Sequence, residues 1–306
     1  MTTTTRRDFI ALAAGGLGLA ALRARGATAP QPGLSLGFSL YGMKTLPLDR
    51  ALSECARIGY RNIELSLMAG FPTDPAKLTP AVSSTIRQQL KTAGLPVASL
   101  LVNLGLTGDE KAHAGYLEVL EIAARFAAEI DPAHPPIVQT VMGGTPAEWE
   151  TKKAMMAARL KEWDAIARPH GVTVAVKGHV LNAVDTPEKL LWIFREAKGT
   201  NLAIAYDHSH YALAGLSIED SLRPLAPYTK FVHVKDARRE GKDVRFLLPG
   251  EGTTNYAEYF RLLKKYGYRG PVVVEVSAQI FNRPGYDPVA AAEKSYAALA
   301  PGWMAP

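Results

Sequence analysis

Short apolar runs alternate with segments of helical periodicity along most of this chain. Several runs, such as Val272-Val273-Val274, are continuously apolar and β-branched, which is typical of strands in a parallel sheet covered by helices. The pattern predicts strands at 34–40, 62–65, 96–101, 137–140, 172–176, 202–206, 229–234 and 272–276. It predicts helices at 48–58, 79–93, 109–130, 146–167, 187–197, 218–225, 256–265 and 288–299.

This repeated alternation of strand and helix predicts an α/β fold, a single (β/α)8 TIM barrel over residues 30–306. No low-complexity linker interrupts the pattern, and a chain of this length can form one barrel domain. A doubly wound open sheet is the alternative, because alternation alone does not show that the sheet closes.

The first 29 residues have a different pattern. Arg6-Arg7-Asp8-Phe9 is a twin-arginine pattern, an apolar stretch of small residues follows at 10–22, and Ala27-Thr28-Ala29 resembles a cleavage site. The apolar stretch is short for a membrane span. The order predicts a twin-arginine signal peptide over residues 1–29 and a periplasmic or secreted mature protein without membrane contact. The alternative is the basic start of an ordinary amphipathic helix.

Charge and cysteine content exclude two classes of protein. The formal net charge is +6 over 306 residues, and removing residues 1–29, with four arginines and one aspartate, leaves +3. No basic stripe with interleaved aromatic residues is present, so a nucleic-acid partner is not expected. Cys55 is the single cysteine, which excludes an intramolecular disulfide framework.

Polar side chains stand at the carboxyl ends of the predicted strands. In the segment 231–236, strand alternation places His233 and Lys235 on one face and the valines on the other. Burying such groups without partners is costly, and TIM barrels carry their active sites at this end of the strands. The residues expected to meet there are Glu64, Gln139, Lys177, His179, Asp207, His210, His233, Lys235 and Glu275.

Two carboxylates and an imidazole among these residues suggest a metal site. Asp207, His233 and Glu275 form a mixed oxygen and nitrogen donor set that suits Mn²⁺, Mg²⁺, Co²⁺ or Zn²⁺. Such an ion could polarise a substrate carbonyl, with Glu275 as a general base and His210 in reach of a substrate oxygen. The alternative is a salt-bridged barrel interior in which Lys235 pairs with Glu275 or Asp207.

Three short motifs in a fixed order resemble the xylose isomerase-like TIM-barrel superfamily of sugar isomerases and epimerases. They are Asp-x-x-His at 207–210, His-x-Lys-Asp at 233–236 and Val-Glu-Val at 274–276. The segment 59–64 is similar to the second strand of that family, and 249–252 is similar to its Gly-rich turn. The resemblance covers nearly the whole mature chain.

This resemblance implies a divalent-metal site in which Asp207, His233 and Glu275 are ligands and His210 contacts substrate. It also implies carbon-acid chemistry on a ketose or related carbohydrate. A small carbohydrate is therefore the expected partner, and a homo-oligomer stays open. Substrate contacts are expected from residues at the strand ends and in the following loops: Tyr41, Glu64, Asn103, Gln139, Lys235 and Arg283.

The fifth strand departs from that family. The family usually places a glutamate at its end, as metal ligand and catalytic base, whereas this chain has Lys177. Strand alternation puts His179 on the same face, which predicts His179 as the fourth metal ligand. Lys177 could then stabilise an enolate oxygen or act as an acid or base. The alternative is a decayed metal site in which Lys177 neutralises Asp207 or Glu275.

Together these observations predict a divalent-metal-dependent enzyme of the sugar isomerase or epimerase type, acting by proton abstraction next to a carbonyl. Because one glutamate is missing, chemistry with a base on one side is easier to support than symmetric two-base epimerisation. A keto-glycoside lyase or hydratase using the same site is the alternative among enzymes. A non-catalytic periplasmic sugar-binding barrel is the alternative of another class.

Overall fold

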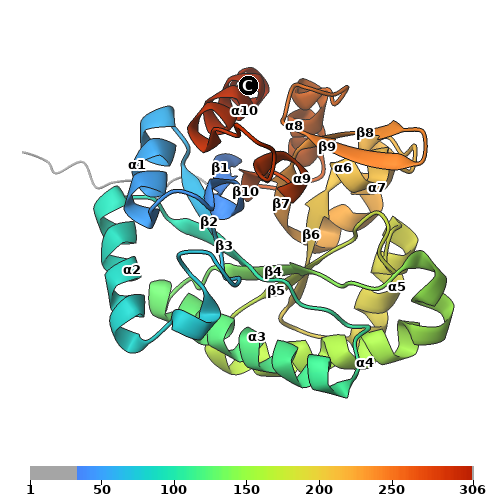
Figure 1. Ribbon diagram of the computed structural model, residues 1–306. Helices are drawn as coiled ribbons and strands as arrows, with labels where there is room; N and C mark the ends of the chain where they lie inside the picture. The colour runs from blue at the N-terminus through green and yellow to red at the C-terminus, as the bar shows by residue number, and fades with distance from the viewer. Residues whose placement is uncertain (1–32, 305–306) are drawn as a thin grey trace, which may run out of the picture. The chain divides into compact units, whose positions relative to one another are not determined.

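Eight parallel strands close into a barrel in the computed structural model, which describes residues 33–304 (Figure 1). The first strand, β1 (Ser35–Ser39), pairs with both β2 (Asn62–Ser66) and β10 (Pro271–Val274), and this pairing closes the sheet. The predicted (β/α)8 barrel is confirmed and the open sheet is excluded. The predicted signal peptide lies outside the described residues, so export stays a prediction.

The strands run in the order β1-β10-β7-β6-β5-β4-β3-β2 around the barrel. The remaining strands are β3 (Val97–Leu101), β4 (Ile137–Val141), β5 (Val174–Lys177), β6 (Leu202–Asp207) and β7 (Thr229–Val234). The main helices form the outer layer and are α1 (Leu48–Ile58), α2 (Pro80–Ala93), α3 (Glu110–Ile130), α4 (Trp149–Ala167), α5 (Pro187–Ala197), α7 (Ile218–Leu225), α8 (Tyr256–Lys265) and α10 (Pro288–Met304).

Helix ends follow local sequence signals. The hydroxyl of Thr79 accepts a hydrogen bond from the Val82 amide at the start of α2, as expected for an N-cap residue. Helix α1 ends at Gly59, whose φ of 112° favours glycine. A Cβ there would also lie 2.9 Å from the hydroxyl of Tyr296. All predicted helices are present, and the last extends to Met304. Among the described residues, no helix is long and apolar enough to cross a membrane.

An antiparallel hairpin between β7 and α8 was not predicted. It consists of β8 (Asp236–Glu240) and β9 (Asp243–Leu247) and lies beyond the barrel, drawn in orange in Figure 1. The sequence signals are Gly241, with φ of 62° at the turn, and the alternating side chains of β9. Two short helices were also missed, α6 (His208–Ala212) and α9 (Ala278–Phe281).

Strand alternation separates the barrel interior into layers. Small and apolar side chains form a buried floor, which contains Ala175, Ala203, Ala205, Phe231 and Val273. Two residues further along each strand, the inward-facing positions hold polar side chains, namely Lys177, Asp207, His233 and Glu275. Because inward positions recur every second residue, the fold brings these four side chains from four strands to one level. The floor residues below them are buried.

Candidate active site

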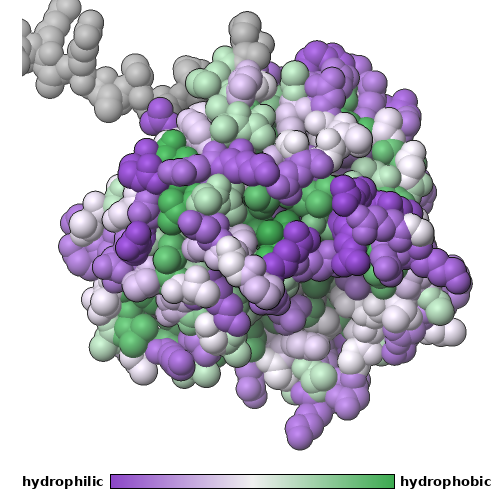
Figure 2. Space-filling model, turned by 45° about the horizontal axis from the view of Figure 1, so that its top comes forward, coloured by the Kyte–Doolittle hydropathy of each residue, from purple (hydrophilic) through white to green (hydrophobic). Residues whose placement is uncertain are grey.

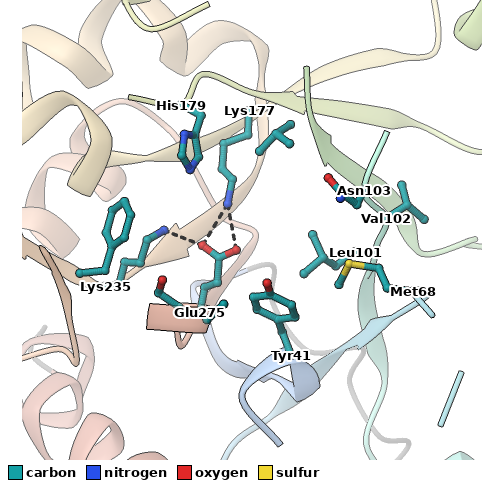
Figure 3. Close-up of a pocket in the computed structure, with 13 residues that line it drawn as sticks. Tyr41, Met68, Leu101, Val102, Asn103, Lys177, His179, Lys235 and Glu275 are labelled. Carbon is teal, nitrogen blue, oxygen red and sulfur yellow. Dashed lines mark hydrogen bonds and ion pairs between the residues drawn. The ribbon is translucent and has the colours of Figure 1, made fainter. Parts of the chain in front are cut away.

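A cavity of about 220 Å³ opens where the strands end (Figure 3). One side carries polar groups from Lys177, His179, Lys235 and Glu275, and the other side is formed mainly by apolar side chains. The remaining lining residues are Tyr41, Met68, Leu101, Val102, Asn103, Val141, Phe246, Ser277 and Ala278. The predicted positions of Tyr41 and Asn103 at the functional end are confirmed.

Two lysine ammonium groups lie among the acidic side chains. The Nζ atom of Lys177 is 3.1 and 3.0 Å from the two carboxylate oxygens of Glu275 and 3.1 Å from Nδ1 of His233. It is also 3.7 Å from Oδ2 of Asp207. The Nζ atom of Lys235 is 2.5 Å from Oε2 of Glu275 and contacts Oδ2 of Asp207. Lys177 therefore contacts Asp207, His233 and Glu275, three of the four predicted metal ligands.

These ion pairs keep the two carboxylates charged although they are buried. Burial would raise the pKa of Asp207, but Lys235, His210 and Lys177 together outweigh this effect and hold the pKa well below its usual range. The pKa of Glu275 is likewise well below its usual range, because Lys177 and Lys235 outweigh burial. Burial lowers the pKa of Lys235, yet Asp207 and Glu275 overcome this and raise it. The carboxylates of Asp207 and Glu275 and the ammonium of Lys235 are therefore ionised at neutral pH.

Glu64 orients His233 and does not line the cavity. Its two carboxylate oxygens accept hydrogen bonds of 2.6 Å from the hydroxyls of Ser39 and Ser99. Nε2 of His233 lies 3.0 Å from Oε1 of Glu64. A proton on Nε2 leaves Nδ1 free to accept from Lys177. The structure does not support the predicted substrate contact of Glu64, because its buried carboxylate faces Ser39, Ser99 and His233 and does not line the cavity.

We expect Glu64→Ala to lower the free energy of unfolding by about 1–3 kcal/mol, because it removes the acceptor of three buried donors. Urea unfolding of the full chain would measure the change. Glu162→Ala is the matched control, since Glu162 also pairs with a histidine, His113, but its side chain is 51% exposed. The control should change stability by less than about 0.5 kcal/mol. Equal effects of the two substitutions would contradict the orienting role.

His179 lines the cavity. It does not belong to the group of possible metal ligands, which consists of Asp207, His233 and Glu275. Its Nδ1 lies 2.5 Å from the carbonyl oxygen of Val180 and donates to it, which leaves Nε2 as an acceptor. Burial, with the charges of Lys177 and Lys235, lowers the pKa of His179 to about 4. Strand β5 ends at Lys177, so the alternation used to predict His179 as a ligand does not extend to it.

His210 is buried behind the cavity and packs against His179, with ring centroids 4.0 Å apart. Its Nε2 lies 3.3 Å from Oδ2 of Asp207 and 3.4 Å from Nζ of Lys235. Burial, with the charge of Lys235, holds its pKa well below the usual range. The structure therefore places His210 as a neighbour of Asp207 rather than as a residue lining the cavity.

We expect the free energy of unfolding to decrease as the pH falls from about 6.5 to about 4. His179 and His208 have pKa values lowered to about 4, mainly by burial, and unfolded histidine titrates near 6.5. The unfolded chain thus binds more protons in this window, which favours unfolding. Urea titrations between pH of about 7 and about 4.5 would show it. His208→Gln should flatten part of the dependence, and equal stability across the window would contradict the prediction.

Two predicted substrate contacts lie elsewhere. Gln139 is fully buried on β4, and neither of its amide atoms has a hydrogen-bond partner among the described residues. Arg283 is exposed, and its Nε donates to the carbonyl oxygen of Gln279. Neither residue lines the cavity. Conversely, Phe246 of the unpredicted hairpin does line it.

The predicted divalent ion and the Lys177 ammonium would share the same donor set. Within residues 33–304, ligand atoms of Asp207, His233 and Glu275 form one group in which all lie within 4.8 Å of one another. In composition this group could hold a metal ion. However, Lys177 contacts the same three residues and already places one positive charge beside them. In this arrangement Asp207, His233 and Glu275 suit the Lys177 ammonium better than they suit a divalent ion.

The Gly-rich turn of the sequence motif is held by Asp236. Its Oδ2 accepts hydrogen bonds of 2.8 and 2.9 Å from the amides of Gly250 and Gly252. A Cβ at Gly252 would lie 2.8 Å from the Cβ of Asp236, so this close approach needs glycine. The last residue of the His-x-Lys-Asp motif thus fixes the loop after β9, and the first and third residues form the polar cluster.

The closed barrel and the polar cluster at the carboxyl ends of its strands define a TIM barrel with a site where this fold carries active sites. The chain belongs to the xylose isomerase-like TIM barrel family, whose model matches residues 52–301. The family that the motifs predicted is thereby confirmed.

Comparison with known proteins adds three similarities. Inosose dehydratase of Mesomycoplasma hyopneumoniae (strain 7448) is 26% identical over 257 residues, which cover 75% of this chain and 81% of that protein. A xylose isomerase domain protein from Alicyclobacillus acidocaldarius has a TM-score of 0.73 at 19% identity, covering 89% of this chain and 98% of that one. The IOLI protein with a bound zinc atom has a TM-score of 0.72 at 20% identity, covering 89% and 100%. The two structures show the shared fold.

Proposed function

We propose that the protein is an enzyme that removes a proton next to the carbonyl of a keto-carbohydrate and expels a leaving group from the following carbon. The observation that carries this proposal is the asymmetry of the cavity. Glu275 is the single carboxylate among the described residues that line it, and the opposite wall carries Met68, Leu101 and Val102 (Figure 3). A base on one side supports elimination, whereas epimerisation by two bases needs one on each side.

The groups around Glu275 suit the charges that develop in such a reaction. As the carboxylate of Glu275 takes the α-proton, the electrons of the C–H bond form an enolate. The ammonium groups of Lys177 and Lys235 stabilise its oxygen. The enolate then re-forms the carbonyl, a double bond forms between the α- and β-carbons, and the β-carbon loses its oxygen substituent with the bonding electrons.

Tyr41 can supply the proton that the departing oxygen needs. It lines the cavity next to Glu275 (Figure 3). Burial and the charge of Glu275 raise the pKa of the Tyr41 hydroxyl, although Lys235 partly opposes them. The phenol is therefore protonated at neutral pH and acts as a donor. The products are an unsaturated ketone and the protonated leaving group.

Similarity to the inosose dehydratases supports elimination over isomerisation. The name of those relatives describes the loss of water from an inosose. The missing glutamate at the end of β5 supports the same choice, because Lys177 offers no second carboxylate base. We therefore place dehydration or a related elimination first, and isomerisation of a ketose through the same enolate second.

A second cavity favours a substrate with a bulky leaving group, as in a keto-glycoside lyase. It measures about 610 Å³, shares Tyr41 with the first cavity, and is also lined by Phe71 and Phe281. The Tyr41 ring centroid lies 5.6 Å from that of Phe71 and 4.8 Å from that of Phe281. Aromatic walls suit the apolar face of a second ring. Apolar side chains also gather between hydrophilic ones on the face shown in Figure 2.

The test is proton exchange in deuterated water with a panel of keto-sugars, inososes and 3-keto-glycosides, followed by NMR and ultraviolet absorbance. Wild-type protein is expected to exchange the α-proton and to form an unsaturated ketone. Matched substrates that lack the β-oxygen should exchange without elimination. Exchange with rearrangement of the carbonyl, and no lost group, would support the isomerase instead. If the protein binds a member of the panel tightly but exchanges the α-proton of none, the result would contradict an enzymatic role and support a sugar-binding barrel.

A further inference from the structure

Lys177 holds a position that a divalent ion would need. Its Nζ lies within 3.0–3.7 Å of donor atoms from Glu275, His233 and Asp207. We infer that the Lys177 ammonium is the resident cation of this site and takes the place of a divalent metal ion. This inference concerns what occupies the site and does not depend on the reaction proposed above.

The distances leave no room for both cations. An ion bound by these residues would lie about 2.0–2.2 Å from their oxygen and nitrogen atoms. The ammonium already touches the same atoms, so an ion would lie against a positive charge in a buried site, where repulsion is strong. Admitting an ion therefore requires the Lys177 side chain to leave the cluster.

Moving the Lys177 side chain away from the carboxylates would be unfavourable. Its side chain is 2% exposed, and it stands on the last residue of β5, with Ala175 below it in the floor. Its neighbour in the sheet register is Val141 of β4, on the apolar wall. Leaving the carboxylates would bury an unpaired ammonium against apolar side chains, which is costly.

The charges of the cluster balance without an ion. The carboxylates of Asp207 and Glu275 face the ammonium groups of Lys177 and Lys235, two negative charges against two positive charges. Even with the buried carboxylate of Glu64 beside His233 counted, a divalent ion added to these side chains would leave an excess of positive charge in a buried site. Such an excess is unfavourable unless further anions enter with the ion.

The imidazole of His233 is set to accept from the ammonium. Because Glu64 holds a proton on Nε2 of His233, the lone pair of Nδ1 faces Lys177 at 3.1 Å. The same orientation of His233 suits a metal ion. With lysine in place of the family's glutamate at the end of β5, the ammonium therefore replaces the ion, while the other residues of the cluster keep their positions. An ammonium offers N–H donors and a single charge, so the site is suited to an oxyanion such as an enolate.

The test measures metal binding without substrate, so its outcome is separate from that of the reaction assay. The full-length wild type, Lys177→Glu and Lys177→Met would be incubated with Mn²⁺ or Zn²⁺, desalted and analysed for metal content, with affinity from calorimetry. Wild type is expected to retain far less than one equivalent. Lys177→Glu adds a carboxylate where the ammonium lies and should retain about one equivalent, with affinity about 10- to 100-fold higher than wild type.

Lys177→Met separates the loss of the ammonium from the gain of a carboxylate ligand, because it removes the ammonium without adding a ligand. It should bind metal more tightly than wild type and less tightly than Lys177→Glu. Thermal unfolding with and without Mn²⁺ gives a second readout, since an ion that binds the folded state raises the melting temperature. This shift should appear in Lys177→Glu and not in wild type.

Two results would overturn the inference. The first is one tightly held equivalent of metal in wild type that Asp207→Asn removes. The second is a folded Lys177→Glu variant that binds no more metal than wild type, because the ammonium would then not stand at a site that an ion can use. If Lys177→Glu does not fold, the wild-type metal content and the Lys177→Met affinity decide the question in the same way.

Discussion

Glu275→Gln is expected to lower the rate of α-proton exchange by about 10²- to 10⁴-fold, the usual contribution of a general base. Glutamine keeps the shape of the side chain and its hydrogen-bonding oxygen but cannot take the α-proton. The loss should appear in kcat more than in KM, because the two lysines that would hold the substrate oxygen remain. Deuterium exchange with the best substrate of the panel measures the change.

Glu251→Gln is the control for this experiment. Glu251 is an exposed residue whose carboxylate accepts from the Leu248 amide and from Lys294, outside the cavity. Its substitution should leave the exchange rate unchanged. Exchange in Glu275→Gln at the wild-type rate would show that another group takes the proton. His179 would then be tested next, because its Nε2 is an acceptor in the same cavity.

Local sequence signals predicted the strands and helices of the barrel, whereas closure of the sheet depends on long-range pairing. Runs such as Val272-Val273-Val274 and the stop at Gly59 locate strands and helices because each depends on local chemistry. Closure of the barrel depends on the pairing of β1 with β10, between residues more than 230 positions apart. No local pattern reports this pairing, so alternation left an open sheet as the alternative.

The sequence predicted which strand-end positions contribute to the site. It did not predict the contacts that their side chains make. The ends of β6, β7 and β10 were predicted closely enough to bring Asp207, His233 and Glu275 together. The prediction for His179 is not supported, because alternation was extended past Lys177, where β5 ends. The sequence left open whether Lys177 stabilises an enolate or neutralises Asp207 or Glu275, since its contacts depend on acceptors from other strands.

Glu64 shows a different limit. Its position at the end of the second strand was predicted, and the inference from position to substrate contact was reasonable for a barrel. The structure gives it three donors, from Ser39, Ser99 and His233, and these occupy its carboxylate. Whether a strand-end carboxylate faces substrate or a neighbouring side chain depends on residues on adjacent strands, which a pattern along one strand does not report.

Lys235→Met is expected to lower the free energy of unfolding by about 3–5 kcal/mol, the usual cost of removing one partner from a buried ion pair. Lys235 contacts Asp207 and Glu275, and its side chain is 2% exposed. Methionine has a similar length but no charge, so Lys177 alone would have to neutralise two buried carboxylates. Urea unfolding at neutral pH measures the loss.

The pH dependence of Lys235→Met distinguishes lost charge from lost packing. In wild type, Lys235 helps to hold the pKa values of Asp207 and Glu275 well below their usual range. The stability this gives is present above the unfolded values near 4 and is lost as the pH falls through the folded values. Without Lys235 the folded values rise, so acid should weaken the variant less than wild type, and the difference between the two proteins should shrink at low pH.

Lys152→Met is the matched control, because Lys152 pairs with Glu148 at 2.5 Å but both side chains are about one-third exposed, at 34% and 32%. Exposed pairs contribute about 0–1 kcal/mol, so this control should be nearly as stable as wild type at every pH. A loss in Lys235→Met that is constant from neutral to acid pH would assign the effect to packing. A loss that shrinks on acidification would show that the buried charges of Asp207 and Glu275 depend on Lys235, and that Lys177 alone cannot replace it.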